Sequence, residues 1–403
     1  MDVRTAFLNG KLDEEIFMVQ PEGFQQGRDL VCRLNRSIYG LKQASRAWNK
    51  RFHQFVTSIG FRRSDNDPCL YIRSVGQEKV FLVLYVDDML IIGPNLKVIQ
   101  IVKKLLSKEF EMVDLGAVSS FLGMHIERDI SGRIMRIDQQ SYLEGLLKKF
   151  GMEDCRPVAT PMEPHLKLQK GEESERTDKP YRELVGCLIY VTLASRPDLA
   201  ASVNYMSQYQ SCPTETHWVH LKRILRYVKG TLNLALEFRG NDREAALSAF
   251  SDADWANDVN DRRSVTGYMF KIYGSTSVWL TRKQPTVSLS STEAEFVALC
   301  TAACEGVWLV RLLADLGIKI GDPVVYYEDN QSCLRVAEEP RDSRRMKHVE
   351  VKYYFIRDLI KEGRIRLEYV PTEHQQADIL TKGLPATTFV KLRKLLGLME
   401  PRN

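Results

Sequence analysis

The sequence has little that would mark a secreted, disulfide-bonded or zinc-binding protein. Its eight cysteines include no CxxC pair, which is the usual spacing of a zinc site or a redox motif. The N-terminus, MDVRTAFLNGKLDEE, has no basic segment followed by an apolar one, as a signal peptide would have. Uninterrupted apolar runs are also far shorter than a membrane span. We therefore expect an intracellular chain with reduced thiols, no secretion signal and no membrane partner.

A strong charge of one sign is absent as well. The 57 Lys and Arg residues nearly balance the 52 Asp and Glu residues, so the formal net charge is only +5 over 403 residues. Such a balance permits nucleic-acid binding without requiring it. The hydrophobic content of 44% is enough for packed cores, and a chain of this length predicts two or three globular domains.

The first part of the chain mixes strand-like and helical patterns. Residues 80–86 (VFLVLYV) and 89–93 (MLIIG) are typical of strands, and residues 98–110 (VIQIVKKLLSKEF) alternate as an amphipathic helix does. A polar segment from Arg156 to Lys179 combines prolines with charges of both signs, which predicts a linker or an exposed loop.

Residues 180–235 are predicted to be helical. In HWVHLKRILRYVKG, an apolar stripe is formed by Trp218, Leu221, Leu225 and Val228. The opposite face carries Lys222, Arg226 and Lys229. A basic face of this kind is either a solvated surface or a set of phosphate contacts, and composition alone does not choose between them.

From residue 245 the pattern predicts the order β-β-β-α-β-α-β-α. The strands are expected in LSAFSD, GYMFKIYG, TSVWLTR, VVYYEDN and RIRLEYV, and the helices in residues 292–317, 344–363 and 375–384. In an open α/β sheet, ligand sites form beyond the carboxyl ends of strands. Asp252 and Asp329 stand where two of these strands end.

Two further acids are expected on helices. Glu295 lies one turn before Leu299, at the edge of the face that packs on the sheet, and Asp378 lies in the final predicted helix. Each has an ordinary alternative. Thr292-x-x-Glu295 and Ser290-x-x-Glu293 both fit a capping box, and Asp378 could be a solvated surface acid.

The segment VFLVLYVDDMLIIG places Asp87 and Asp88 side by side between two apolar runs. A hairpin turn accounts for one aspartate, but two adjacent carboxylates repel each other in a poorly solvated setting. A divalent cation such as Mg²⁺ would offset that repulsion. A turn and a metal site both remain open from this segment alone.

The C-terminal part resembles the RNase H domain of copia-type retrotransposons. The motifs that carry the resemblance are SDADWAND, SLSSTEAEFVAL, YYEDNQSCL, KHVEVKYYFIRD and TEHQQADILTKG, in that order. The resemblance implies four catalytic, metal-binding carboxylates: Asp252, Glu295, Asp329 and Asp378. It also implies two Mg²⁺ ions, with Mn²⁺ as an alternative, that promote hydrolysis of the RNA strand of an RNA–DNA hybrid. His374 is expected to be a surface residue, and the role of His348 is open.

The N-terminal part resembles the copia-type reverse transcriptase. MDVRTAFLNGKLDEEIFMVQPEGF, SIYGLKQASRAWNKRF, LYVDDML and SFLGMHIERD match successive blocks of that polymerase palm. By this resemblance Asp2, Asp87 and Asp88 are catalytic metal ligands, and Lys42 and Gln43 border an incoming dNTP. The implied reaction is attack of a primer 3′-OH on the dNTP α-phosphate. Tyr39 and Trp48 are expected in the core.

The expected fold is α+β or α/β. A polymerase palm without fingers (1–160) is followed by a linker and helical thumb or connection (161–244), an RNase H-like mixed five-stranded sheet with flanking helices (245–388) and a C-terminal tail (389–403). Because Asp2 is the second residue, we expect no strand to fix it, and hence an impaired polymerase in a fragment of a Pol polyprotein. The expected partners are RNA–DNA hybrid, primer–template and dNTPs, in a cytoplasmic particle or the nucleus. The alternative is a noncatalytic nucleic-acid-binding remnant.

Overall fold

The computed structural model describes residues 1–76, 78–241, 244–321, 323–338 and 350–400. Contacts divide the chain into two compact units, residues 1–118 with 311–318 and residues 119–310 with 319–403. Each unit has its own hydrophobic core.

The first unit is built on an antiparallel sheet with the strand order β4-β5-β6-β7-β1-β8. Its strands are β1 (Asp2–Val3), β4 (Arg62–Arg63), β5 (Leu70–Val75), β6 (Glu78–Tyr85), β7 (Asp88–Ile92) and β8 (Met112–Val113). A separate two-stranded ribbon pairs β2 (Phe17–Val19) with β3 (Val31–Arg33), and a short 3₁₀ helix, η1 (Ala6–Asn9), follows β1.

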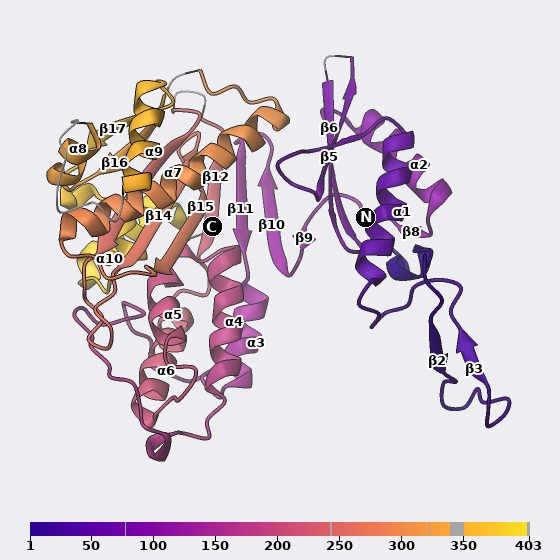
Figure 1. Ribbon diagram of the computed structural model, residues 1–403, viewed down its shortest axis with the longest axis horizontal. Helices are drawn as coiled ribbons and strands as arrows, with labels where there is room; N and C mark the ends of the chain where they lie inside the picture. The colour runs from indigo at the N-terminus through magenta and orange to yellow at the C-terminus, as the bar shows by residue number, and fades with distance from the viewer. Residues whose placement is uncertain (77, 242–243, 322, 339–349, 401–403) are drawn as a thin grey trace. The chain divides into compact units, whose positions relative to one another are not determined.

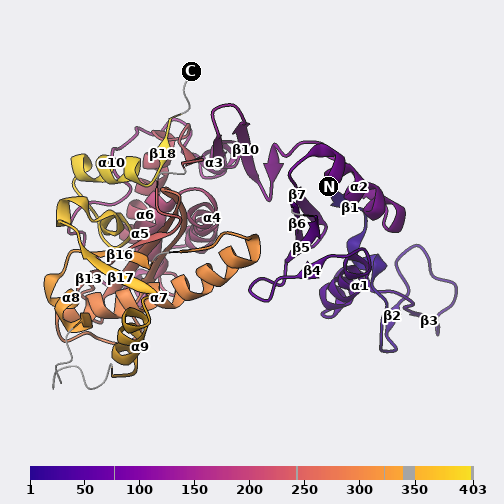
Figure 2. The ribbon, with the colours of Figure 1, turned by 90° about the horizontal axis from the view of Figure 1, so that it is seen from above.

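Two amphipathic helices, α1 (Ala44–Ser58) and α2 (Leu96–Glu109), lie on one face of this sheet (Figure 1 and Figure 2). Trp48 and Phe52 of α1 and Val102 of α2 are buried against it. The side chain of Asn95 accepts a hydrogen bond from the amide of Val98, which caps the first turn of α2. The burial of Trp48 confirms its predicted core position, whereas Tyr39 is 53% exposed.

The second unit contains a cluster of helices that contact one another (Figure 1). They are α3 (Gln140–Lys149), α4 (Tyr181–Ala194), α5 (Ala200–Ser207) and α6 (Glu215–Lys229), with the 3₁₀ helices η2 (Glu173–Glu175) and η3 (Pro197–Leu199). The four residues of the predicted apolar stripe on α6 are all buried.

Most of the segment from Arg156 to Lys179 is exposed, as predicted for an exposed loop, but part of it is anchored. Thr160, Met162 and Leu168 are buried, and the hydroxyl groups of Tyr205 and Tyr209 bind the backbone amide and carbonyl of Leu168. Since a buried backbone needs such partners, the part around Leu168 is fixed to the second unit.

One sheet of the second unit has the order β18-β12-β11-β10-β9. Its strands are β9 (Ser120–Phe121), β10 (Met124–Asp129), β11 (Ile134–Asp138), β12 (Ala235–Arg239) and β18 (Leu398–Met399). It therefore draws strands from the segments predicted as palm, connection and tail. The predicted domain boundaries at 160, 244 and 388 all fall between strands of this one sheet, and they stay predictions.

The other sheet is mixed and has the order β15-β14-β13-β16-β17, as expected for the C-terminal part. Its strands are β13 (Ser248–Asp254), β14 (Val265–Ile272), β15 (Ser275–Lys283), β16 (Val324–Glu328) and β17 (Ile365–Tyr369). The pairs β13–β16 and β16–β17 are parallel. Phe250 and Met269 pack with the helical cluster, while Ala253 packs against Ala294 and Ala298 of the helix α7 (Ser291–Leu316), so elements cover both faces.

The remaining elements are α8 (Gln331–Glu338), α9 (Glu350–Lys361), η5 (Thr372–His374), η6 (Gln376–Leu380) and α10 (Ala386–Leu395). Three expectations are corrected. The final predicted helix is the short 3₁₀ helix η6, the predicted tail contains most of α10 and all of β18, and α8 was missed. Asn330 explains α8, because its side chain accepts a hydrogen bond from the amide of Cys333 and starts a helix directly after β16.

Among the described helices, α7 alone is long and apolar enough to cross a membrane by length and composition. More than half of its apolar window, 56%, is buried inside the protein. A helix at the centre of a core passes the same test, and packing on the mixed sheet accounts for its composition.

Candidate functional site

Two neighbouring parallel strands bring Asp252 and Asp329 to the same end of the mixed sheet. Phe250 of β13 is in register with Tyr327 of β16, and each acid follows two residues later. Because the carboxyl ends of parallel strands converge, the two carboxylates face one region. Asp252 is buried, and Asp329 is partly buried.

The start of α7 delivers the third acid. The side chain of Glu293 accepts a hydrogen bond from the amide of Leu289, and Ser290 Oγ accepts one from the amide of Glu293. Ser290 therefore caps the helix, and Glu293 reaches back to the backbone that precedes it. Glu295 does not cap, and its side chain, only 7% exposed, is turned into the protein.

Asp252, Glu295 and Asp329 each offer one oxygen within 4.8 Å of the others. Glu295 Oε2 is buried and has no hydrogen-bond partner, although an unpaired buried acceptor is costly. Burial, together with the negative charges of Asp252, Glu328 and Asp329, raises the pKa of Glu295 to about 12. An oxygen ligand set of this kind fits a divalent cation such as Mg²⁺, whose charge would favour the ionised carboxylate and oppose the rise in pKa.

The fourth predicted acid, Asp378, lies beside this group but faces a lysine. Lys382 Nζ is 2.8 Å from Asp378 Oδ1 and 3.8 Å from Asp252 Oδ2. Burial, and next the charge of Asp252, raises the pKa of Asp378 to about 7, and Lys382 opposes the shift. The sequence did not single out Lys382, although its i,i+4 spacing from Asp378 could have suggested an ion pair.

Several uncharged side chains hold these acids in place, and sequence reasoning missed them. Thr381 Oγ1 donates a hydrogen bond to Asp252 Oδ2, and Thr372 Oγ1 donates one to Asp329 Oδ2 at 2.6 Å. Gln375 is fully buried and donates from Nε2 to the carbonyl of Ser251 at 2.9 Å. The two residues of each hydrogen bond lie 43 to 129 positions apart in the chain. A local sequence pattern therefore cannot predict these bonds.

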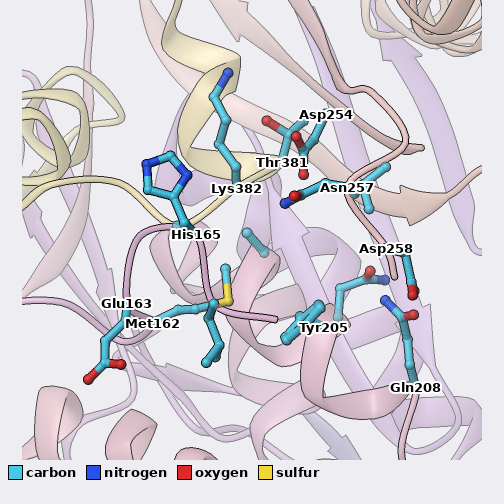
Figure 3. Close-up of a pocket in the computed structure, with 15 residues that line it drawn as sticks. Met162, Glu163, His165, Tyr205, Gln208, Asp254, Asn257, Asp258, Thr381 and Lys382 are labelled. Atoms are coloured by element: carbon cyan, nitrogen blue, oxygen red, sulfur yellow. The ribbon is translucent and has the colours of Figure 1, made fainter. Parts of the chain in front are cut away.

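A cavity of about 150 Å³ opens beside this centre. Figure 3 shows Lys382 and His165 on one side of it, and Asp254 and Asn257 on the other. Burial raises the pKa of Asp254 to about 6. Gln208 also lines the cavity, and its Nε2 is buried without a hydrogen-bond partner.

The other predicted acids belong to the first unit. Asp2 pairs with Asp88 of β7 on one side and with Val113 of β8 on the other. The amide of Val3 donates to the carbonyl of Asp87 at 2.9 Å, and that of Met89 to the carbonyl of Met1 at 2.8 Å. The expectation that Asp2 has no hydrogen-bonded strand to fix it is wrong, because β1 is held between two strands.

Burial, and then the charges of Asp87 and Asp2, raise the pKa of Asp88, so the three carboxylates lie near enough to interact. Among the described residues, however, only Asp252, Glu295 and Asp329 meet as a close group of potential metal ligands. The structure thus brings the palm acids to neighbouring positions without the tight cluster seen in the second unit.

The turn that carries the paired aspartates has a strained backbone at Val86 and is held by a hydrogen bond from Trp48. Tyr85 of β6 pairs with Asp88 of β7, so Val86 and Asp87 form a two-residue hairpin turn. Val86 has a φ of 56°, which is unfavourable for a β-branched side chain. The indole Nε1 of Trp48 donates to the carbonyl of Val86 at 2.6 Å and so helps to hold the turn.

The remaining predicted residues occupy less specific positions. Lys42 is exposed, and Gln43 precedes α1, with Nε2 3.5 Å from Glu14 Oε2. Lys222, Arg226 and Lys229 are partly exposed, and Arg226 Nε donates to the carbonyl of Arg156 at 2.8 Å. His374 is exposed, as expected. His348 lies outside the described residues.

Residues 1–164 match the family of reverse transcriptases (RNA-dependent DNA polymerases). Over 99% of its length the chain is 39% identical to a retrovirus-related Pol polyprotein of transposon TNT 1-94 from Nicotiana tabacum and 37% identical to that of transposon RE2 from Arabidopsis thaliana. It spans 30% and 27% of these relatives. A transposon Ty5-1 protein of Saccharomyces cerevisiae is 32% identical over 76% of this chain and 100% of its own length.

Among solved structures, LC11-RNase H1 is similar over 34% of this chain and 93% of its own, with 16% identity and a TM-score of 0.28. Prototype foamy virus protease–reverse transcriptase is similar over 88% of this chain and 41% of its own, with 10% identity and a TM-score of 0.24. Both scores are low, so family membership rests on the sequence relatives. The chain belongs to the family of copia-type retrotransposon Pol polyproteins, with a reverse transcriptase domain at residues 1–164.

Proposed function

We propose that the second unit cleaves the RNA strand of RNA–DNA hybrids with the help of a divalent cation. The observation that carries this proposal is the buried, unpartnered Oε2 of Glu295 beside Asp252 and Asp329. A carboxylate in that position needs a positive partner, and divalent ions of this type promote phosphodiester hydrolysis by activating water and stabilising the leaving oxygen. We propose Mg²⁺ as the ion, with Mn²⁺ as an alternative.

The protein's own part in this reaction is to hold the ligands in place. Thr381 fixes Asp252, and Thr372 fixes Asp329. Glu295 is delivered by a helix whose start is separately held by Ser290 and Glu293. Because the acids stand on strand ends and a helix rather than on free loops, their geometry is set before a substrate binds.

We propose RNA-directed DNA polymerisation as the activity of the first unit, with Asp2, Asp87 and Asp88 as its acids. The support is the paired strand that carries Asp2 and the hairpin that carries the other two acids. Primer–template and dNTPs are the proposed partners, with Lys42 and Gln43 near the nucleotide. The expected impairment of this activity stays a prediction. One reason for it, the lack of a hydrogen-bonded strand at Asp2, does not hold.

For the hybrid we propose contacts of the phosphates with Lys222, Arg226 and Lys229 of α6. Their partial exposure supports the proposal, although Arg226 already binds a backbone carbonyl. Recognition would use helix shape and the RNA 2′-hydroxyl rather than base edges. We further propose an intracellular location, in a cytoplasmic particle or the nucleus.

The test is cleavage of a labelled RNA–DNA hybrid by the purified chain with Mg²⁺ and with EDTA. Asp329→Asn should reduce cleavage to background, whereas Glu373→Gln, which also removes a carboxylate but at an exposed position, should cleave normally. Salt-sensitive hybrid binding by a folded chain that does not cleave with either ion would favour the noncatalytic remnant instead.

Primer extension on an RNA template tests the first unit separately. Extension that is lost in Asp88→Asn but kept in Asp329→Asn would assign polymerisation to the hairpin acids. Hybrid cleavage without any extension would support an inactive palm attached to an active nuclease.

A further inference from the structure

Lys382 is a partly buried cation among acids. Its side chain is 33% exposed, and Nζ lies between Asp378 Oδ1 and Asp252 Oδ2. It follows η6, so Asp378 and Lys382 are four residues apart on one short segment. The same segment supplies Thr381, whose hydroxyl holds Asp252. One stretch of chain therefore places both an acid and its counter-charge.

Lys382 places one positive charge against the group of acids. Its Nζ lies 2.8 Å from Asp378 Oδ1 and 3.8 Å from Asp252 Oδ2, and the residue lines the cavity together with Asp254. Because a lysine ammonium is charged at neutral pH, Lys382 is a fixed positive group on one side of the cluster.

The acids themselves divide into two sets. Asp252, Glu295 and Asp329 bring their oxygens within 4.8 Å of one another, and Asp378 is not part of that group. Asp378 instead has the ammonium of Lys382 at 2.8 Å. A divalent ion bound by Asp378 and Asp252 would stand close to this ammonium, and the two positive charges would repel each other.

We propose that Lys382 takes the place of a second divalent ion, so that in the absence of substrate the centre binds one ion, at Asp252, Glu295 and Asp329. This inference rests on the proposed nuclease function and changes the implied ligand set, because Asp378 becomes the ion-pair partner of Lys382. Lys382 is then a positioning residue whose charge limits the number of ions.

The experiment counts Mn²⁺ ions bound by the full chain without nucleic acid, from the loss of the free Mn²⁺ signal in electron paramagnetic resonance. All variants carry Asp87→Asn and Asp88→Asn, so that the palm acids do not contribute ions. This reference chain should bind one ion, Lys382→Arg should also bind one, and Lys382→Met should bind two. Adding Asp378→Asn to Lys382→Met should return the count to one.

Thermal unfolding in EDTA and in Mn²⁺ shows whether each variant folds. Lys382→Met should melt at a lower temperature than the reference in EDTA, because the acids lose their counter-charge, and Mn²⁺ should restore much of the difference. Two ions in the reference chain, with Lys382 in place, would overturn the inference while leaving the nuclease proposal intact. If no variant binds Mn²⁺, the metal centre of the proposed function fails as well. A reference count of two overturns the inference even if Lys382→Met does not fold, and a folded Lys382→Met that binds only one ion would overturn it as well.

Discussion

At the scale of single residues, the centre depends on groups that touch the acids rather than on the acids alone. Thr381 is buried and donates its hydroxyl to Asp252 Oδ2. Thr381→Val keeps the shape of the side chain and removes this bond, so we expect hybrid cleavage to fall by about 10- to 100-fold, as for other partners of metal ligands. Thr381→Ser keeps the hydroxyl and is the matched control, with cleavage near that of the unaltered chain. Equal cleavage rates for the Val and Ser variants would show that Thr381 does not orient Asp252.

The raised pKa of Glu295 makes stability depend on pH in a definite direction. Between its ordinary value of 4.5 and about 12, the folded chain holds a proton that the unfolded chain has released. Stability without metal therefore falls as pH rises above about 4.5, and Asp378, with a pKa of about 7, adds to the fall up to that pH. In EDTA we expect a higher melting temperature at pH 5.5 than at pH 7.5.

Glu295→Gln should weaken this pH dependence, because an amide has no proton to lose. It should also raise the melting temperature in EDTA at pH 7.5. A gain of about 1–2 kcal/mol from removing a poorly paired buried acid corresponds to roughly 2–8 °C for a unit of this size. Differential scanning calorimetry checks both effects, and a variant that melts lower at pH 7.5 with the same pH slope as the unaltered chain would contradict the assignment.

The residues show what a sequence can and cannot reveal about a site. Asp252 and Asp329 were found because the apolar run of a strand stops at each of them, although β13 itself continues to Asp254. The choice between Glu293 and Glu295 came from resemblance, since both fit a capping spacing, and the hydrogen bonds of Glu293 now supply the physical reason. The sequence did not predict a role for Lys382, because that role depends on Asp252, 130 positions earlier in the chain.

At the scale of elements, the paired-aspartate hairpin illustrates support from a neighbouring helix. Trp48 of α1 holds the carbonyl of Val86 in a turn with an unfavourable backbone angle. Trp48→Phe keeps most of the apolar contact but removes the donor, which should cost about 1 kcal/mol of stability. We expect primer extension to fall by more than the loss of folded protein alone would cause. Hybrid cleavage per folded molecule should stay the same.

Phe52→Leu, which changes the same core but not the turn, is the control for packing. A proportional loss of both activities would argue against a specific effect on the hairpin.

Elements were predicted best where a strong local period exists. The alternating strands and the long helix of the mixed sheet were all anticipated, because their apolar residues repeat with period 2 or 3.6. The strands β12 and β18 were not. Their pairing partners lie far away in the chain, so their existence depends on tertiary contacts that no local pattern contains.

At the scale of the whole molecule, the hydrophobic core of the second unit extends across the domain boundaries that the sequence predicts. The same cluster contains Leu143, Leu225, Phe250, Ile379 and Leu392. Residues from the predicted palm, connection, nuclease and tail thus bury one another. A sequence boundary drawn at composition changes cannot reveal such a core, since even the polar and mostly exposed segment 156–179 contributes Leu168 to it.

This core predicts which pieces of the chain fold. A piece with residues 119–403 keeps the whole cluster, so we expect one cooperative thermal transition and hybrid cleavage. A piece with residues 245–388 keeps the four acids and Lys382 but loses the helical cluster and most of α10, including Phe389 and Leu392, which are buried at 4% and 1% exposure. Each lost apolar contact of this kind is worth about 1.5–3 kcal/mol, and together they exceed the margin of an ordinary domain. The shorter piece should therefore show no cooperative transition and no cleavage.

Circular dichroism at near- and far-ultraviolet wavelengths, recorded during heating, compares the two pieces. A shorter piece that melts cooperatively and cleaves hybrid would show that the nuclease sheet is independent of the helices packed on it.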